Sequence, residues 1–431
     1  MTTQKPLAIH AHVQKVGDLL ASPRGREERP RMRPIYLRSL VAGALIALLL
    51  SGMALLFAPA SHASAMAEND TDGYVYVLNN NLVGSNSITV FGREEDGSLT
   101  LSGTTSIGGT GSVLAFADGT QGSLIITHDE GTRLFAVDAG SDQISVVNVH
   151  NGHLSLAGVF ASYGAGPVSL TYHDGLLYVL NAANGRTSAA NMAGFHVDEE
   201  GELHYIPGST RTLSVPHPDP GQVQIDPSGY FLLVTEKLTN LLDVYRIGED
   251  GSLSAATTFA SVGAIPFGMA FNLTGSRHQL IVTDAAGGPN NTGAATSYRL
   301  SHGTLNLING PVFDFQVAPC WLVITNDGRF AYTSNADSLT ISGYSIAANG
   351  AISLLTPDGA TATAPPATFP IEEALSSDSH YLYVLDSRLL LKTPGPATLL
   401  GYHINHDGTL TSVVDPSQIT LLLSAIGLAA E

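Results

Sequence analysis

Cysteine is almost absent from this chain, since Cys320 is the only one among 431 residues. A single cysteine excludes an intrachain disulfide, and its position far from the N-terminal region excludes a lipid anchor attached there. Charged side chains are scarce as well, at 13% of residues, whereas hydrophobic residues make up 44% and 45 residues are glycine. This composition is typical of a turn-rich β protein held together by its core, and not of a disordered chain.

Positively charged residues, Lys and Arg, are also few. Residues 66–431 hold 11 Lys and Arg against 34 Asp and Glu, a net charge near −23. A surface of that sign repels phosphate backbones and anionic lipid headgroups, which excludes nucleic acid as a partner. The sequence also lacks a Gly-x-Ser-x-Gly elbow, a phosphate-binding loop and a dinucleotide fingerprint. The enzyme classes that depend on those motifs are therefore not predicted.

One long apolar run, Leu40–Phe57, follows an Arg-rich stretch near the N-terminus, and Ala63-Ser64-Ala65 then supplies a small-x-small pattern. Together these features predict that residues 1–67 are an export signal, with Met32 as an alternative start, and that the protein is secreted. Because the run has 18 residues, the short limit for a membrane span, an uncleaved anchor with the rest of the chain outside is the alternative. N-terminal sequencing of the secreted protein distinguishes the two.

A polar residue followed by glycine, with Leu or Ile two positions after the glycine, occurs seven times along the chain. Successive glycines are 55, 49, 50, 52, 47 and 58 residues apart. Asp-Gly and Asn-Gly between hydrophobic runs indicate tight hairpins, because glycine adopts positive φ without a Cβ clash. A period in this range indicates a repeat architecture. The seven turn glycines are Gly97, Gly152, Gly201, Gly251, Gly303, Gly350 and Gly408.

Each repeat contains four strand-like runs. In residues 221–260, Gly221–Ile225 alternates, Tyr230–Thr235 is strongly β-forming, Leu241–Ile247 alternates again and Leu253 begins a fourth run. Four strands that repeat about every 50 residues indicate the blades of a β-propeller.

First strands are found in only six repeats, because the N-terminal repeat begins directly with a second strand at Tyr74. The missing first strand is predicted at Ala425–Ala430, where it would complete the first blade and remove an open sheet edge. The predicted fold class is thus all-β, a seven-bladed propeller of four-stranded antiparallel blades over residues 73–431, closed by its C-terminal strand. The six predicted first strands are Ser112–Phe116, Pro167–Thr171, Gly221–Ile225, Pro266–Phe271, Pro319–Ile324 and Pro370–Leu375.

Three segments of these repeats, Gly221–Gly229, Asn326–Asn335 and Asp378–Leu385, resemble the seven-bladed propeller lactonase family. Its members include a bacterial 6-phosphogluconolactonase and fungal carboxy-muconate cyclising enzymes, and the resemblance covers roughly residues 73–431. It implies a propeller that hydrolyses a small lactone. These residues mainly form the fold, so they are more specific for architecture than for activity.

The chain departs from the family at two positions. Where the lactonases usually show Gly-Pro-Arg-His before a first strand, this chain has Ala264–Gly268 and lacks both the Arg and the His. The Asn-Arg pair expected after the seventh-blade second strand reads Asp386-Ser387-Arg388, with the Arg displaced. His217 and Glu236 match the family pattern.

The loops that precede the first strands form one rim of a propeller, and ligands in such folds bind at the mouth of the central channel. Lactone hydrolysis requires a base to activate water and a donor to stabilise the oxyanion. We predict His217 or Glu236 as the base and Arg388 or Lys237 as the donor. The predicted substrate-binding residues are Glu372, Glu373, Asp284, Asn335 and Lys237. Each also has a structural alternative, a hydrogen bond to loop backbone.

No cofactor is predicted, although carboxylates from several blades can converge on Ca²⁺ in a channel. Cys320 is interpreted as a small buried thiol. Two functions remain open from the sequence. The first is a secreted lactonase-like enzyme that acts on a small sugar or carboxylic lactone, and the second is a non-catalytic propeller that binds a ligand or a surface. In either case we expect a monomer whose only membrane contact would be an uncleaved N-terminal segment.

Overall fold

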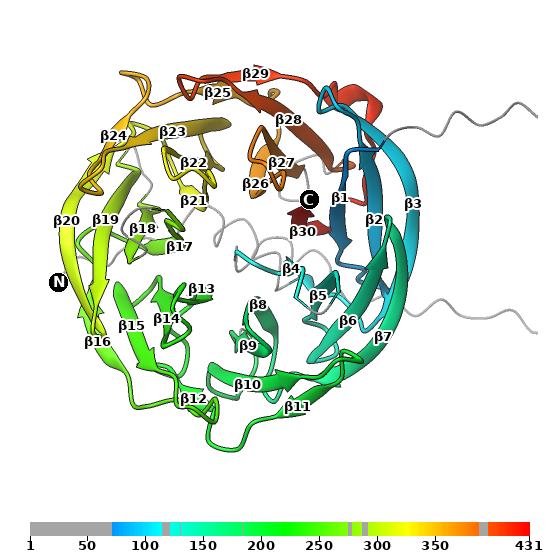
Figure 1. Ribbon diagram of the computed structural model, residues 1–431, viewed down its shortest axis with the longest axis vertical. Coiled ribbons are helices and arrows are strands. Elements are labelled where there is room, and N and C mark those ends of the chain that lie inside the picture. The colour runs from blue at the N-terminus through cyan, green and yellow to red at the C-terminus, as the bar shows by residue number, and fades with distance from the viewer. Residues whose placement is uncertain are drawn as a thin grey trace, which may run out of the picture.

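The computed structural model describes residues 71–113, 121–129, 131–183, 185–274, 278–286, 292–387 and 395–431. Seven antiparallel sheets are arranged around a ring, each with one strand at the centre and its last strand at the periphery (Figure 1). This is the predicted seven-bladed β-propeller. Within the described ranges, no helix is long and apolar enough to cross a bilayer. The predicted export signal or anchor, residues 1–67, lies outside the described residues.

The first three blades have these strands: β30 Ala425–Ala430, β1 Gly73–Asn79, β2 Asn86–Arg93 and β3 Leu99–Gly108 in blade 1; β4 Leu124–Thr127, β5 Arg133–Asp138, β6 Gln143–His150 and β7 His153–Ala161 in blade 2; β8 Pro167–His173, β9 Leu176–Asn181, β10 Asn191–Val197, β11 Leu203–Tyr205 and β12 Arg211–Thr212 in blade 3.

The remaining four blades follow the same order: β13 Pro220–Ile225, β14 Phe231–Glu236, β15 Leu241–Arg246 and β16 Thr257–Ala260; β17 Pro266–Phe271, β18 Gln279–Asp284, β19 Ala294–Ser301 and β20 Thr304–Phe313; β21 Pro319–Ile324, β22 Phe330–Asn335, β23 Thr340–Ile346, β24 Ile352–Leu354 and β25 Ala362–Thr363; β26 Phe369–Leu375, β27 Tyr381–Ser387, β28 Thr398–Ile404 and β29 Leu410–Ser412. A short 3-10 helix, η1 Pro416–Gln418, precedes β30.

The ring closes through its two ends. Strand β30 pairs antiparallel with β1, so that Ala430 faces Val75 and Ala425 faces Asn79, and the red β30 lies beside the blue β1 in Figure 1. The predicted closure is confirmed. This pairing covers the edge of β1 and gives blade 1 the inner strand that the other blades have.

The turn glycines join neighbouring blades. The Gly97 turn of blade 1 lies against blade 7, where Tyr383 Oη donates to its carbonyl at 2.9 Å and a Cβ on Gly97 would lie 2.2 Å from the Tyr381 ring. The Gly251 and Gly408 carbonyls accept in the same way from Tyr178 and Tyr332 of the preceding blades. Glycine is therefore required twice over, for positive φ and for close packing between blades.

The inner strand of blade 2 corrects one prediction. We expected Ser112–Phe116, but the strand is Leu124–Thr127, and Ser112 is not part of a strand. The prediction took the apolar residues after Ser112 for this strand, but a later apolar run, Leu124–Thr127, pairs with β5. Residues 114–116 of the predicted strand lie outside the described residues. In the sequence, residues 109–123 separate β3 from β4, whereas only residues 162–166 separate β7 from β8, so we call residues 109–123 an insertion.

Candidate active site in the central channel

A cavity of about 480 Å³ lies among the inner strands. Its walls come from β4, β8, β13, β26 and β30, at the later residues of most of these strands. The exposed residues His128 and Asp129, just after β4, line its outer end. The cavity thus reaches the rim where the inner strands end, opposite the rim formed by the loops that precede them.

Glu372 and Glu373 line this cavity together. Consecutive residues of a regular strand face opposite sides, but the register of β26 against β27 shifts between Ile371 and Glu373. The resulting β-bulge leaves Glu372 without a partner on β27 and explains how both carboxyl groups line one cavity. Glu372 is 2% exposed and Glu373 is 4% exposed.

The two carboxyl groups have different surroundings. Glu372 Oε1 accepts from the Gly122 amide at 3.4 Å, while both oxygens of Glu373 have no hydrogen-bond partner among the described residues. Burial raises the pKa of Glu372 well above its usual value, and the Gly122 hydrogen bond lowers it in part. Burial raises the pKa of Glu373 as well, and the neighbouring Glu372 raises it further. Glu372 is therefore the group of the pair that is favoured to ionise.

Gln121 crosses the channel at the inner end of the cavity. Its side chain donates to Leu322 O at 2.6 Å and accepts from Leu322 N at 3.0 Å. Its backbone amide donates to Gly221 O at 3.2 Å, and its carbonyl accepts from Ser169 Oγ at 2.6 Å. Gln121 therefore ties together the inner strands of blades 3, 4 and 6 and forms the floor of the cavity.

The remaining polar wall consists of amides and hydroxyls. Gln222 Oε1 accepts from the Met269 amide at 2.6 Å, and Thr171 Oγ1 accepts from the Ile225 amide at 3.0 Å. Gln224 Oε1 is buried with no hydrogen-bond partner among the described residues. No Lys or Arg is among the described residues that line the cavity.

Sequence reasoning predicted Glu372 and Glu373, but it missed Gln121, Gln222 and Gln224. A signal for the last two was available, because both alternate with apolar residues within a predicted inner strand. Gln121 had no such signal, since it lies in the insertion between two blades.

Three of the predicted residues, Glu236, Asp284 and Asn335, occupy one repeated position. Each ends the second strand of its blade and faces the first proline of the inner strand, as Asn181 does in blade 3. Asn335 Nδ2 donates to Thr340 and Ser342 hydroxyls at 3.0 and 2.8 Å. The position also holds Asn79, Asp138 and Asp386, all buried. A position filled by Asn, Asp or Glu in every blade fits a structural role in the repeat.

Two of the predicted catalytic residues, His217 and Glu236, lie on the rim where inner strands begin. His217 is exposed, and Glu236 is fully buried and accepts from the Ser214 amide at 2.9 Å and from Thr239 Oγ1 at 2.5 Å. No hydrogen bond or ion pair joins His217 to Glu236 in the part of the chain that the structure describes. Lys237 Nζ lies 3.0 Å from Asp219 Oδ1. Arg388 lies outside the described residues.

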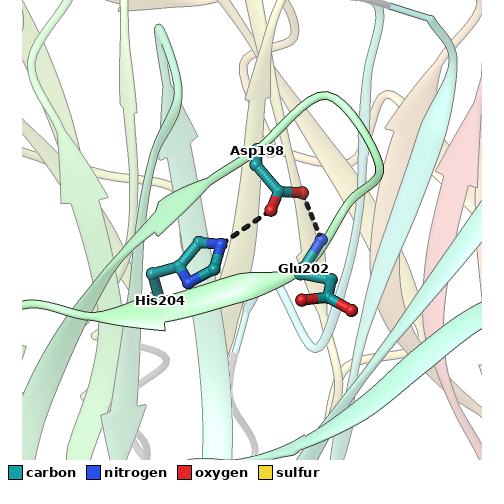
Figure 2. Close-up of side chains that lie close together, drawn as sticks. All are labelled: Asp198, Glu202 and His204. Carbon is teal, nitrogen blue, oxygen red and sulfur yellow. Dashed lines mark hydrogen bonds and ion pairs between the residues drawn. The ribbon is translucent and has the colours of Figure 1, made fainter.

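Asp198, which is half-buried, and the exposed Glu202 and His204 lie close together on the hairpin formed by β10 and β11 (Figure 2). Asp198 accepts from the Glu202 amide at 2.8 Å and lies 2.6 Å from His204 Nε2. The hydrogen bond from His204 lowers the pKa of Asp198. These bonds hold the turn itself, and such a group resembles the turns of other blades more than a metal centre. Cys320 is fully buried, as predicted, and burial raises the pKa of its thiol.

The comparisons with known proteins agree with this architecture. A family model described as Lactonase, 7-bladed beta-propeller, matches residues 123–288, which is less than half of the chain. The resemblance to the seven-bladed lactonases is confirmed. None of the curated protein sequences is significantly similar to this lactonase-like propeller.

Solved structures give the same result. A periplasmic gluconolactonase from Pseudomonas aeruginosa is 16% identical to this lactonase-like propeller over 83% of this chain and 98% of its own, with a TM-score of 0.62. A candidate 6-phosphogluconolactonase from Bacteroides fragilis is 16% identical over 85% of this chain and 99% of its own, also with a TM-score of 0.62. A protein from Lactobacillus plantarum is 16% identical over 83% of this chain and 99% of its own, with a TM-score of 0.64. At this identity the likeness establishes the fold.

Proposed function

We propose that this lactonase-like propeller hydrolyses a small lactone in the channel cavity. The observation that carries the proposal is the pair of buried carboxyl groups, Glu372 and Glu373, that line one cavity with unlike hydrogen bonding. Two adjacent buried carboxyl groups, of which only one is hydrogen-bonded to a backbone amide, are suited to act as one base and one acid. The matching family model and the gluconolactonase of the same fold support this choice of reaction.

Glu372 is the base in this mechanism, because the Gly122 amide stabilises its ionised form. It takes a proton from a water molecule whose oxygen attacks the lactone carbonyl carbon. Glu373 stays protonated and gives its proton to the ring oxygen as the acyl C–O bond breaks. The product is the open hydroxy acid, and a proton then passes from Glu372 to Glu373 to restore the starting state.

The amides of Gln222 and Gln224 would orient the substrate. Both lie in the wall that Glu372 and Glu373 complete, and a side-chain amide offers two N–H donors. A donor directed at the carbonyl oxygen stabilises the negative charge that develops during attack. The floor at Gln121 would keep bulk water from the inner end of the cavity.

Steady-state hydrolysis of D-glucono-1,5-lactone by the full chain tests this function. We expect Glu372→Gln and Glu373→Gln each to lower kcat by about 100-fold or more, the usual size of a general acid or base contribution. The exposed Glu202→Gln is the matched control and should keep full activity. Hydrolysis no faster than in buffer, or full activity in both channel variants, would contradict the proposal. His217→Ala and Glu236→Gln test the other rim, and loss of activity in these alone would move the site there.

A ligand-binding propeller without catalysis is the second candidate, and one position favours it. Where lactonases usually have Arg-His after the proline, this chain has Phe267-Gly268. The Phe267 ring lies 5.2 Å from the Trp321 ring and 4.8 Å from Lys237 Nζ. The position is filled by a packed aromatic residue. Lactone binding without turnover in the same assay would favour this second function.

We also propose that the propeller works outside the cytoplasm, either as a free secreted protein or anchored to the membrane by an uncleaved N-terminal segment. The Arg-rich stretch before Leu40–Phe57 supports export, and the periplasmic neighbour has the same fold. Recovery of the protein only in the cytoplasmic fraction would refute this.

A further inference from the structure

The charge of the cavity narrows the class of substrate. Its described lining includes the carboxyl groups of Glu372, Glu373 and Asp129 and no Lys or Arg. Lys237, the cation predicted to bind substrate, lies on the other rim and is paired with Asp219. The described lining therefore offers no fixed positive charge to a phosphate or carboxylate group, and an ionised Glu372 would repel either one.

The hydrogen-bonding capacity of the cavity also disfavours phosphate and carboxylate groups. Four buried oxygen atoms, Glu372 Oε2, both oxygens of Glu373 and Gln224 Oε1, have no partner among the described residues. Because Glu373 stays protonated in the proposed mechanism, one of its oxygens carries a donor and the other three atoms are acceptors. Unpaired buried acceptors cost free energy, so a ligand that brings several donors is favoured. Sugar hydroxyl groups donate, whereas ionised phosphate and carboxylate groups mainly accept.

We infer that the substrate is an uncharged polyhydroxylated lactone of sugar type, and that lactones with a phosphate or carboxylate group are rejected. This inference rests on the proposed function and selects between the sugar and carboxylic lactones that the sequence left open. The cavity, at about 480 Å³, is within the usual range for small-molecule sites, about 300–1,000 Å³.

The carboxyl groups of the cavity lining also favour release of the product. Hydrolysis adds water across the acyl C–O bond of a neutral lactone and yields a hydroxy acid that ionises near neutral pH. The product thus acquires the charge that the cavity disfavours. Substrate enters without an electrostatic penalty, and product leaves with an electrostatic gain.

Binding to ligands that are not hydrolysed separates this inference from the proposed function. The probes are D-glucono-1,5-lactam, in which N–H replaces the ring oxygen, and its 6-phosphate, titrated calorimetrically into the full chain. We expect the neutral lactam to bind at least about tenfold more tightly than its phosphate, and the double variant Glu372→Gln, Glu373→Gln to reduce that preference. Glu202→Gln is again the control and should leave the preference unchanged.

Each outcome of these titrations either supports or contradicts the inference. Equal or tighter binding of the phosphate overturns the inference, as does failure of the neutral lactam to bind. A preference that persists in the double variant overturns the role of the two glutamates. Tight, selective binding of the lactam by a protein that does not hydrolyse the lactone sustains the inference and removes only the proposed catalysis.

Discussion

Buried carboxyl groups occur at two kinds of position in this protein, and they differ in what surrounds them. Asp284, at the repeated end of a second strand, accepts from Thr296 Oγ1 at 2.5 Å, whereas its counterpart Asn335 donates to the Thr340 and Ser342 hydroxyls. Glu373 occurs once in the ring, lines the cavity and has no hydrogen-bond partner among the described residues. The sequence predicted both as site residues, because a single polar residue in an apolar strand looks the same in either case. Only the register of the strands separates a repeated position from a unique one.

Asp284→Asn should stabilise the protein at alkaline pH. Burial raises the pKa of Asp284 to about 7, so the folded state keeps a proton that the unfolded chain loses above about pH 4. The free energy of unfolding therefore falls as pH rises from about 4 to about 7. The Asn variant removes this penalty, and we expect a gain on the order of 2–4 kcal/mol at pH 8 and little at pH 4.

Urea denaturation at both pH values measures the effect of Asp284→Asn. Asp250→Asn serves as the control, since Asp250 is exposed and hydrogen bonds from Ser252 lower its pKa. It should show no such gain at pH 8. An equal change at both pH values for Asp284→Asn would mean that ionisation is not the cause.

The strands were largely predictable, because each blade repeats the same alternation and turn chemistry. The inner strands of blades 5 and 6 begin and end where the sequence predicts, at Pro266–Phe271 and Pro319–Ile324. Blade 2 was not predictable, because the insertion before β4 contains a second short apolar run, and such a run alone does not identify a strand. The bulge at Glu372 was also hidden, since it depends on pairing with β27 and not on composition. The local pattern of polar and apolar residues thus predicts where a strand lies. It does not predict which side chains of that strand face the channel, because this depends on the register with the next strand.

Gly97→Ala should destabilise the protein more than Gly84→Ala. The two glycines have similar positive φ values, 82° and 89°, so an alanine costs about 1–2 kcal/mol at either position. A Cβ at Gly97 would also meet the Tyr381 ring, whereas nothing lies within 4 Å of one at Gly84. Displacing that ring loosens the packing between blades 1 and 7, and we expect a total loss of about 3 kcal/mol or more.

Thermal and urea unfolding of Gly97→Ala and Gly84→Ala provide the comparison. The difference between the two variants isolates contact between blades from backbone strain. Equal losses would show that the turn glycine serves only its own hairpin.

The whole ring depends on two segments from opposite ends of the chain. Strand β30 supplies the inner strand of blade 1, and Tyr76 Oη donates to Glu431 Oε1 at 2.5 Å across this closure. The sequence predicted closure because one repeat lacked a first strand. It did not predict the cavity, because the residues that meet there come from five blades and one insertion, and no single repeat contains that arrangement.

Deletion of residues 420–431 should prevent cooperative folding. The deletion removes β30 and exposes the edge of β1, which favours aggregation. We expect loss of the thermal transition by circular dichroism and of the monomer peak in size-exclusion chromatography. A melting temperature equal to that of the full chain would rule out closure as a source of stability.

A transplanted strand provides the control for this deletion. Because Ala430 faces Val75, residues 420–431 can be placed before residue 72 through a short linker and still pair with β1. This permuted chain should recover the thermal transition. Failure to recover it would assign the effect of the deletion to something other than strand pairing.

Gln121 has a consequence for how a ligand is oriented. Seven similar blades around an axis would offer a small molecule seven nearly equivalent ways to lie, and a reaction at one bond needs one of them. Gln121 belongs to an insertion that occurs once, and it bonds to the inner strands of blades 3, 4 and 6. Beside it, the Gly122 amide selects one carboxyl group of a pair that is also unique. These residues break the rotational pseudosymmetry of the ring where the chemistry would occur. A bound ligand is thereby held in one orientation in the cavity.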